Sequence, residues 1–169
     1  MKHFFFAIAL LCAALPAGAQ GRYGHLNFGE LLNIMPETKG AEASLEAFQK
    51  QLTAQGEAMA AKFQADYTEA VRLMQNGELT PVQQQQKQTE LQQQQQAIAA
   101  YEEQMTQQIN ARREELLKPI IDKADAAIAT VAKANQFVMV FDTSVFNAIL
   151  FAGETEDLLP LVKTQLGIQ

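Results

Sequence analysis

Apolar residues recur every three or four positions along two long stretches of the chain, which is the spacing of an amphipathic helix. The first stretch, residues 36–76, carries this stripe at Leu45, Phe48, Leu52, Met59, Phe63, Tyr67, Ala70, Val71 and Met74. The second, residues 81–118, carries it at Ile98, Tyr101, Met105, Ile109 and Leu116, and the stripe goes on to Ile120. Because each stripe can bury against the other, the pattern predicts two long helices paired as a coiled coil.

A short run, residues 76–81, separates these stretches and has the chemistry of a tight connection. Gly77 can adopt the left-handed conformation that ends a helix, directly after Asn76. Thr80 can cap the next helix, with Pro81 at its first position and Gln83 completing a capping box. At 1.5 Å per residue, each helix would be about 55–60 Å long. The sequence therefore predicts a long antiparallel helical hairpin with its tip at residues 76–81.

The start of the second stretch is unusually rich in glutamine. Ten of the fourteen residues in 83–96 are glutamine, and only Leu91 among them is large and apolar. One interpretation is a disordered or aggregation-prone segment. Glutamine also forms helix fairly well, and the flanking caps favour a helix that packs only thinly against its partner. In that case the tip of the hairpin is expected to be mobile.

Three short segments outside the hairpin predict β-strands: residues 23–28, where Leu26 and Phe28 alternate on one face, and the apolar runs 137–141 and 148–152. The last two are apolar at every position, so both of their faces require cover. Residues 29–34 are expected to form a helical turn between the first strand and the hairpin.

Two further helices are expected near the end of the chain. Pro119 should kink or briefly interrupt the second long helix, after which residues 120–134 continue as a core-packing helix. Asp157 can cap a short last helix that has Pro160 in its first turn and ends at Gly167.

The predicted fold is α+β and mostly α: a coiled-coil tentacle, residues 36–118, inserted in a small β-sheet body formed by residues 20–35 and 119–169. A body of three short strands is too small to stand alone. Since its apolar strand faces lack cover within one chain, we expect copies of the chain to associate through the sheet.

The first nineteen residues have the pattern of a secretory signal peptide: a basic start, an apolar run of about a dozen residues, and Ala17-Gly18-Ala19 as the cleavage pattern. Cleavage after Ala19 would make the mature chain, from Gln20 onward, an exported protein. A lipid anchor on Cys12 is an alternative that the mid-run position of this cysteine disfavours. The mature chain would then contain no cysteine, and loss of Lys2 would change its net charge from −6 to −7. Such an acidic chain is a poor candidate for binding nucleic acid or an anionic membrane, and no later segment is apolar enough for a stable membrane anchor.

The sequence gives little support for catalysis. His25 is the only histidine after the predicted cleavage site, and a structural or surface role suits it best. We find no metal-ligand cluster and no glycine-rich phosphate loop, so we expect no enzyme activity, no metal and no cofactor. Paired carboxylates such as Glu102 and Glu103 are most simply solvated helix faces.

The mature sequence as a whole resembles the Skp/OmpH family of periplasmic chaperones. The resemblance is carried by residues 24–32, 35–39, 118–123, 137–142 and 157–162, in the order strand, hairpin, strand and terminal helix. It implies a homotrimer whose three tentacles enclose a cavity for unfolded outer-membrane β-barrel proteins, held without ATP until insertion. Basic tentacles that bind lipopolysaccharide also belong to this family. Because this chain is acidic, with Arg112 and Arg113 as its densest basic spot, lipopolysaccharide binding is not carried over.

Two expectations, client binding on the tentacle and association of copies through the body, give the candidate functional residues. Client contacts are predicted on the tentacle at Met59, Phe63, Tyr67, Leu73, Met74, Leu79, Val82, Ile98, Tyr101 and Met105. For Met59, Met74 and Met105 the simpler interpretation is packing within the coiled coil, and the same alternative applies to Phe63 and Tyr67. Trimer contacts are predicted in the body at Leu26, Phe28, Phe137, Met139, Phe141, Ile149 and Phe151. The alternative function is a structural or adaptor coiled-coil protein of the cell envelope, whose hairpin docks a folded partner.

Overall fold

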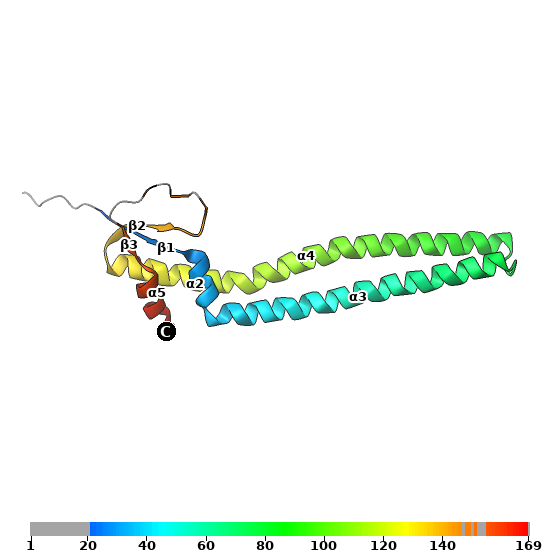
Figure 1. Cartoon of the computed structure of the whole chain (residues 1–169), viewed down its shortest axis with the longest axis horizontal. Helices are drawn as coiled ribbons and strands as arrows, with labels where there is room; N and C mark the ends of the chain where they lie inside the picture. The colour runs from blue at the N-terminus through cyan, green and yellow to red at the C-terminus, as the bar shows by residue number, and fades with distance from the viewer. Residues whose placement is uncertain (1–20, 147, 150, 152–154, 169) are drawn as a thin grey trace, which may run out of the picture. The chain divides into compact units, whose positions relative to one another are not determined.

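The computed structural model describes residues 21–146, 148–149, 151 and 155–168, and the signal peptide prediction for residues 1–19 lies outside them. Chain contacts divide the described residues into two compact units. One unit is the helical hairpin, Leu32–Ala124, and the other is a body formed by the residues up to Leu31 and from Asp125 onward. Figure 1 traces the order of elements along the chain, which is mostly helical with one small sheet. The predicted fold class is confirmed in this respect.

The hairpin consists of α3, Pro36–Gln75, and the larger part of α4, Pro81–Ala134. The two helices run side by side in opposite directions and are joined by the predicted turn (Figure 1). Gly77 has φ +67°, and its N–H and that of Glu78 donate to the carbonyls of Met74 and Leu73, so α3 ends in a Schellman motif.

The predicted capping box begins α4. The Thr80 N–H donates to Gln83 Oε1 at 2.9 Å, and the Gln83 N–H returns to Thr80 Oγ1 at 3.4 Å. Helix α4 then continues without interruption through the glutamine tract, so residues 83–96 are helical.

Pro119 lies inside α4, and the helix is continuous there, so of the two predicted alternatives, a kink or a brief interruption, the interruption is wrong. Proline removes one N–H from the helix ladder, but burial on the neighbouring turns keeps the helix in place. Ile120 and Ala124 are buried and Leu116 is half-buried, all on one helix face.

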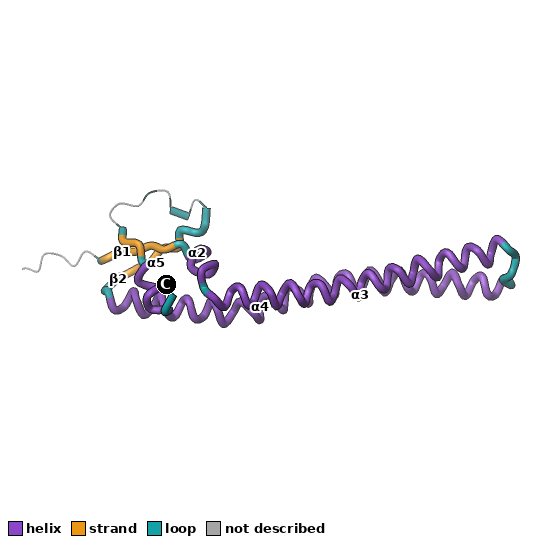
Figure 2. The backbone as a smooth tube through the Cα atoms, turned by 60° about the horizontal axis from the view of Figure 1, so that its bottom comes forward, coloured by secondary structure: helices purple, strands orange, loops and turns teal. Residues whose placement is uncertain are grey.

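The sheet of the body has three parallel strands in the order β2-β1-β3. Figure 2 shows β1 and β2 in orange. The central strand β1 is Arg22–Leu26, β2 is Phe137–Asp142, and β3 is only Glu156–Asp157. The Arg22 guanidinium connects all three: it lies 4.5 Å from the Phe137 ring centroid, and it donates to the Asn135 carbonyl at 2.7 Å and to Glu156 at 2.5 Å.

Two strand predictions are wrong. Ala148, Ile149 and Phe151 are not in a strand, while Leu150 and Ala152 of that predicted segment lie outside the described residues. Phe28 is not in a strand either, because it begins α2, Phe28–Ile34, which is the predicted helical turn. The third strand of the sheet is the one that pairs with β1. That strand is the short polar β3, which follows the apolar segment 148–152 in the chain.

The core of the body forms where the sheet meets helices from both ends of the chain. Its buried residues include Leu26, Leu31, Ala127, Val131, Leu158 and Val162. Gly24 in β1 makes this packing close, since a Cβ there would lie 2.2 Å from Leu158 Cδ1. Val162 belongs to the last helix, α5, Leu159–Leu166. The N-cap of α5 is Leu158 and not Asp157, but the Leu159 N–H still donates to the Asp157 carboxylate at 2.9 Å. Gly167 with φ +71° ends the helix, as predicted.

Candidate functional site

The hairpin covers its large apolar side chains incompletely. Among its described residues, the buried apolar positions are Met35, Ala41, Leu52, Ala70, Ile120 and Ala124. All ten side chains predicted as client contacts are less buried than these. Tyr67, Met74 and Val82 are exposed, and the other seven are half-buried. Two helices alone therefore leave a discontinuous apolar strip open along the hairpin, reaching from Met105 to the tip.

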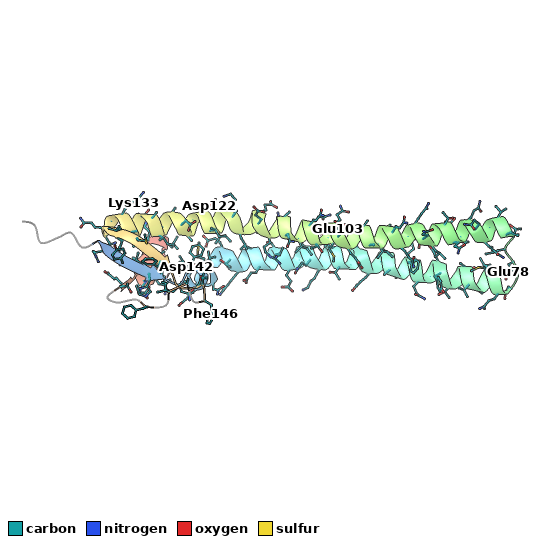
Figure 3. The ribbon with its side chains drawn as sticks, turned by 90° about the horizontal axis from the view of Figure 1, so that it is seen from above. Glu78, Glu103, Asp122, Lys133, Asp142 and Phe146 are labelled. Atoms are coloured by element: carbon teal, nitrogen blue, oxygen red, sulfur yellow. The ribbon has the colours of Figure 1, made fainter. Side chains whose placement is uncertain are left out.

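The larger candidates on α3 lie next to one another. The rings of Phe63 and Tyr67 stack with centroids 6.2 Å apart, one helical turn from each other. Met74 lies in the turn of α3 that precedes the tip, and Leu79 is in the connection itself. Figure 3 marks the tip by Glu78. Four candidates, Leu73, Met74, Leu79 and Val82, therefore lie at or next to the tip. Ile98, Tyr101 and Met105 lie further from the tip, along α4.

One of the ten candidates has a clear structural role. The Tyr101 hydroxyl of α4 donates to the Leu52 carbonyl of α3 at 2.9 Å. Gly56 of α3 makes room for the ring, since a Cβ there would lie 3.3 Å from Tyr101 Cε1. Tyr101 thus joins the two arms, and only part of its ring remains available to a ligand.

Ion pairs along the arms are mostly local and exposed. Lys62 with Asp66 and Lys50 with Glu46 are spaced four residues apart, and Arg72 pairs with Glu69 at 2.8 Å. These hydrogen-bonded cations hold the pKa values of all three carboxyls below their ordinary values. Each such exposed pair contributes little to stability. The arms therefore present a mixed charged surface with apolar gaps.

Sequence reasoning missed a shallow groove of about 640 Å³ between the two arms. It is lined by Ser44, Ala47, Phe48, Gln51, Gln108, Ala111, Arg112 and Glu115. A signal was present in the sequence, because Ser44, Ala47 and Ala111 are small residues that flank the apolar stripes of the two arms. Small side chains at facing positions leave space that larger ones would fill.

The body also exposes apolar side chains. Of the predicted trimer contacts, Met139, Phe141 and Phe151 are exposed, whereas Phe28, Phe137 and Ile149 are half-buried. Leu26 is only 2% exposed, so its own chain already covers it. The prediction overlooked Tyr23, Val138, Val145 and Phe146, which are exposed as well. Phe146 is 91% exposed and lies in the loop after β2 (Figure 3). Its signal was the apolar pair Val145-Phe146, which follows the doubly apolar segment 137–141 after only three polar residues.

The described part of the chain has neither a membrane-spanning helix nor a cluster of metal ligands. No helix there is both long enough and apolar enough to span a membrane. The same residues contain no group of three or more His, Cys, Asp or Glu side chains placed to hold a metal ion. His25 Nδ1 lies 3.1 Å from the Thr155 hydroxyl, where it links β1 to the residue before β3.

Comparisons with known proteins agree with the geometry of the hairpin and the sheet. The sequence matches the family described as outer membrane protein (OmpH-like) over residues 22–166, and the chain belongs to this family. The structure resembles a crystal structure of an OmpH-like protein from Caulobacter crescentus CB15, a candidate outer membrane chaperone. The TM-score is 0.70 and the sequence identity 14%, with 89% of this chain and 86% of the other covered. No curated protein matches the sequence.

Proposed function

We propose that this protein is an ATP-independent holdase chaperone of the periplasm that binds unfolded outer-membrane proteins and prevents their aggregation before membrane insertion. The observation that carries the proposal is the incomplete burial of large apolar side chains along the hairpin, including Tyr67, Met74 and Val82. Membership of the OmpH-like family and the description of the Caulobacter relative support it.

The apolar strip suits an unfolded client better than a folded partner. An unfolded β-barrel chain exposes many short apolar segments without one defined shape. A strip built from methionine, tyrosine and aliphatic residues can adapt to such segments, because methionine is flexible and polarizable. Its contacts are small and separated, so each is weak and release requires no energy source. Binding then depends on many contacts along the arm, without a catalytic step or a cofactor.

We further propose that three copies associate through the exposed apolar residues of the body. Strand β2 is at the edge of the sheet, and Val138, Met139 and Phe141 on it are exposed. An apolar strand that is exposed at the edge of a sheet favours pairing with another chain. Exposed apolar surface of this kind marks an interaction site more often than a free surface. Light scattering after size exclusion should give a mass of about three chains, and a monomer would contradict the trimer.

The chaperone function is tested with a β-barrel protein unfolded in urea and diluted into buffer. We expect the oligomer, at less than one per client, to keep the client soluble, as followed by light scattering. The control is an equal mass of a folded globular protein without hairpins. Aggregation at the same rate with intact oligomer and control would overturn the proposal and favour the adaptor alternative. A folded envelope partner would then be the ligand.

Export is tested separately from client binding. We propose that residues 1–19 direct the chain to the periplasm and are then removed. The mature protein isolated from the periplasm should begin at Gln20. A chain recovered with residues 1–19 intact would contradict this step without affecting the chaperone assay.

A further inference from the structure

The seam between α3 and α4 contains one polar contact where apolar packing is expected. Gln94 Nε2 of α4 donates to Asp66 Oδ2 of α3 at 2.6 Å, and the contact is partly buried. The other amide atom, Gln94 Oε1, is buried and has no hydrogen-bond partner among the described residues. Buried polar atoms without partners are rare in folded proteins because they lose their bonds to water. The seam is therefore weakened at this layer.

Packing between α3 and α4 differs on the two sides of the contact between Asp66 and Gln94, toward the body and toward the tip. On the body side, Tyr101 bonds to the Leu52 carbonyl and lies against Gly56, and Leu52 is buried. Each side has one buried residue near this contact, Leu52 in the described range 45–65 toward the body and Ala70 in the described range 67–93 toward the tip. The difference lies in the half-buried apolar side chains. Large and aromatic ones continue on the body side at Phe48, Met59, Phe63, Ile98 and Met105, whereas α4 contributes only Leu91 on the tip side. A segment with few buried apolar contacts opens at low free energy.

We propose that the contact between Asp66 and Gln94 is a built-in joint, beyond which residues 67–93 open as a unit while the arms stay paired on the body side. The orphaned oxygen lowers the barrier to separation at this layer, and the Tyr101 contact stops the opening from spreading toward the body. The inference concerns the hairpin alone and stands whether or not the protein holds clients. If it does, the joint would let the tips separate around clients of different size.

Hydrogen exchange followed by mass spectrometry on the whole protein tests the joint. In the unmodified protein, residues 67–93 should exchange together and faster than residues 45–60. The double variant Asp66→Leu with Gln94→Leu removes both polar groups and fills the seam, so exchange over 67–93 should slow by about tenfold. The control Gln95→Leu makes the same change at an exposed neighbour and should stay within about twofold of the unmodified protein.

A second variant separates the joint from an ordinary ion pair. Asp66 also bonds to Lys62 at 2.5 Å, so a purely helix-stabilising role is the competing explanation. In Asp66→Asn the new amide can donate to the orphaned Gln94 oxygen while its carbonyl accepts from the Gln94 amide. The joint predicts slower exchange over 67–93 in this variant, whereas loss of an ion pair predicts faster exchange. Faster exchange would overturn the proposal, as would equal protection of 67–93 and 45–60 in the unmodified protein. Asp66→Asn decides the question if the double leucine variant aggregates.

Discussion

The Asp142 carboxylate at the end of β2 accepts a hydrogen bond from the Phe28 N–H, the first amide of α2, at 3.1 Å. The same carboxylate accepts from the N–H and the hydroxyl of Ser144 at 2.8 and 2.7 Å. Burial alone would raise the pKa of Asp142, but these hydrogen bonds outweigh it and leave the pKa below its ordinary value. One side chain therefore fastens the start of α2 to a strand more than a hundred residues later.

Replacing Asp142 tests how much these hydrogen bonds stabilise the body. Asp142→Ala removes the acceptor for a helix N-terminus and should lower the free energy of unfolding by about 1–2 kcal/mol. Asp142→Asn keeps one oxygen that can accept from the Phe28 and Ser144 amides, so it should lose less than half as much. Urea unfolding followed by circular dichroism measures both. Equal losses in the two variants would mean that the charge, and not the hydrogen bonding, stabilises the body.

Close packing on β1 makes Gly24 sensitive to any side chain. A Cβ there would meet the buried Leu158 at 2.2 Å and the Phe137 ring at 3.2 Å. Gly24→Ala should therefore destabilise the protein by about 1–3 kcal/mol through overpacking. Gly40→Ala is the matched control, because no heavy atom of the described residues lies within 4 Å of its Cβ position in α3. That change should stabilise the chain by about 0.5–1 kcal/mol. Thermal unfolding should show opposite shifts, and shifts of the same sign would contradict the packing.

Local chemistry made the hairpin predictable from the sequence. Gly77, Thr80 and Gln83 act on their own neighbours, so the turn they form does not depend on the rest of the fold. Asn27 gave a comparable signal that was missed: its side chain accepts from the Glu30 N–H at 2.9 Å and caps α2, which takes Phe28 out of the strand.

Long-range contacts explain the errors. Strand β3 consists of two acidic residues and has no apolar pattern, since it is placed by β1 and by the Leu158 N–H that donates to the His25 carbonyl at 2.8 Å. The continuity of α4 at Pro119 likewise depends on burial of Ile120 and Ala124. On the arms, periodicity located the stripe but could not tell a buried Leu52 from an exposed Met74. That difference arises from how two helices face each other.

The bond from Tyr101 to Leu52 can be removed without changing the ring. Tyr101→Phe leaves the Leu52 carbonyl without its side-chain donor and should lower the free energy of unfolding by about 1 kcal/mol. Tyr67→Phe is the control, since Tyr67 is half exposed and its hydroxyl makes no hydrogen bond within the described ranges. It should change stability by less than about 0.5 kcal/mol. Equal effects in urea unfolding would show that the cross-arm bond does not stabilise the hairpin.

Acid should weaken the hairpin. Hydrogen bonds from Lys123 to Glu37, from Lys62 to Asp66 and from Arg72 to Glu69 lower the pKa values of these carboxyls in the folded chain. A carboxyl with a lowered pKa contributes stability above its unfolded pKa, and this stability is lost as the pH falls through the folded value. The urea midpoint should stay level from pH 7 to about 5 and fall below about pH 4. A midpoint that rises on acidification would contradict these contacts.

Client binding should depend on the exposed apolar residues more than on the glutamines around them. The triple variant Tyr67→Ser, Met74→Ser and Val82→Ser removes three exposed contacts and should weaken client affinity by about tenfold or more. The control is Gln75→Ser, Gln85→Ser and Gln88→Ser, three exposed positions on the same two helices whose combined loss of helix propensity is at least as large as that of the apolar variant. Both variants should keep the mass and helicity of the unmodified protein, as measured by light scattering and circular dichroism. Fluorescence titration with an unfolded β-barrel protein then separates them, because only the apolar variant should lose affinity. If the two lose affinity equally, polar contact along the glutamine tract holds the client and the apolar strip serves only to pair the helices.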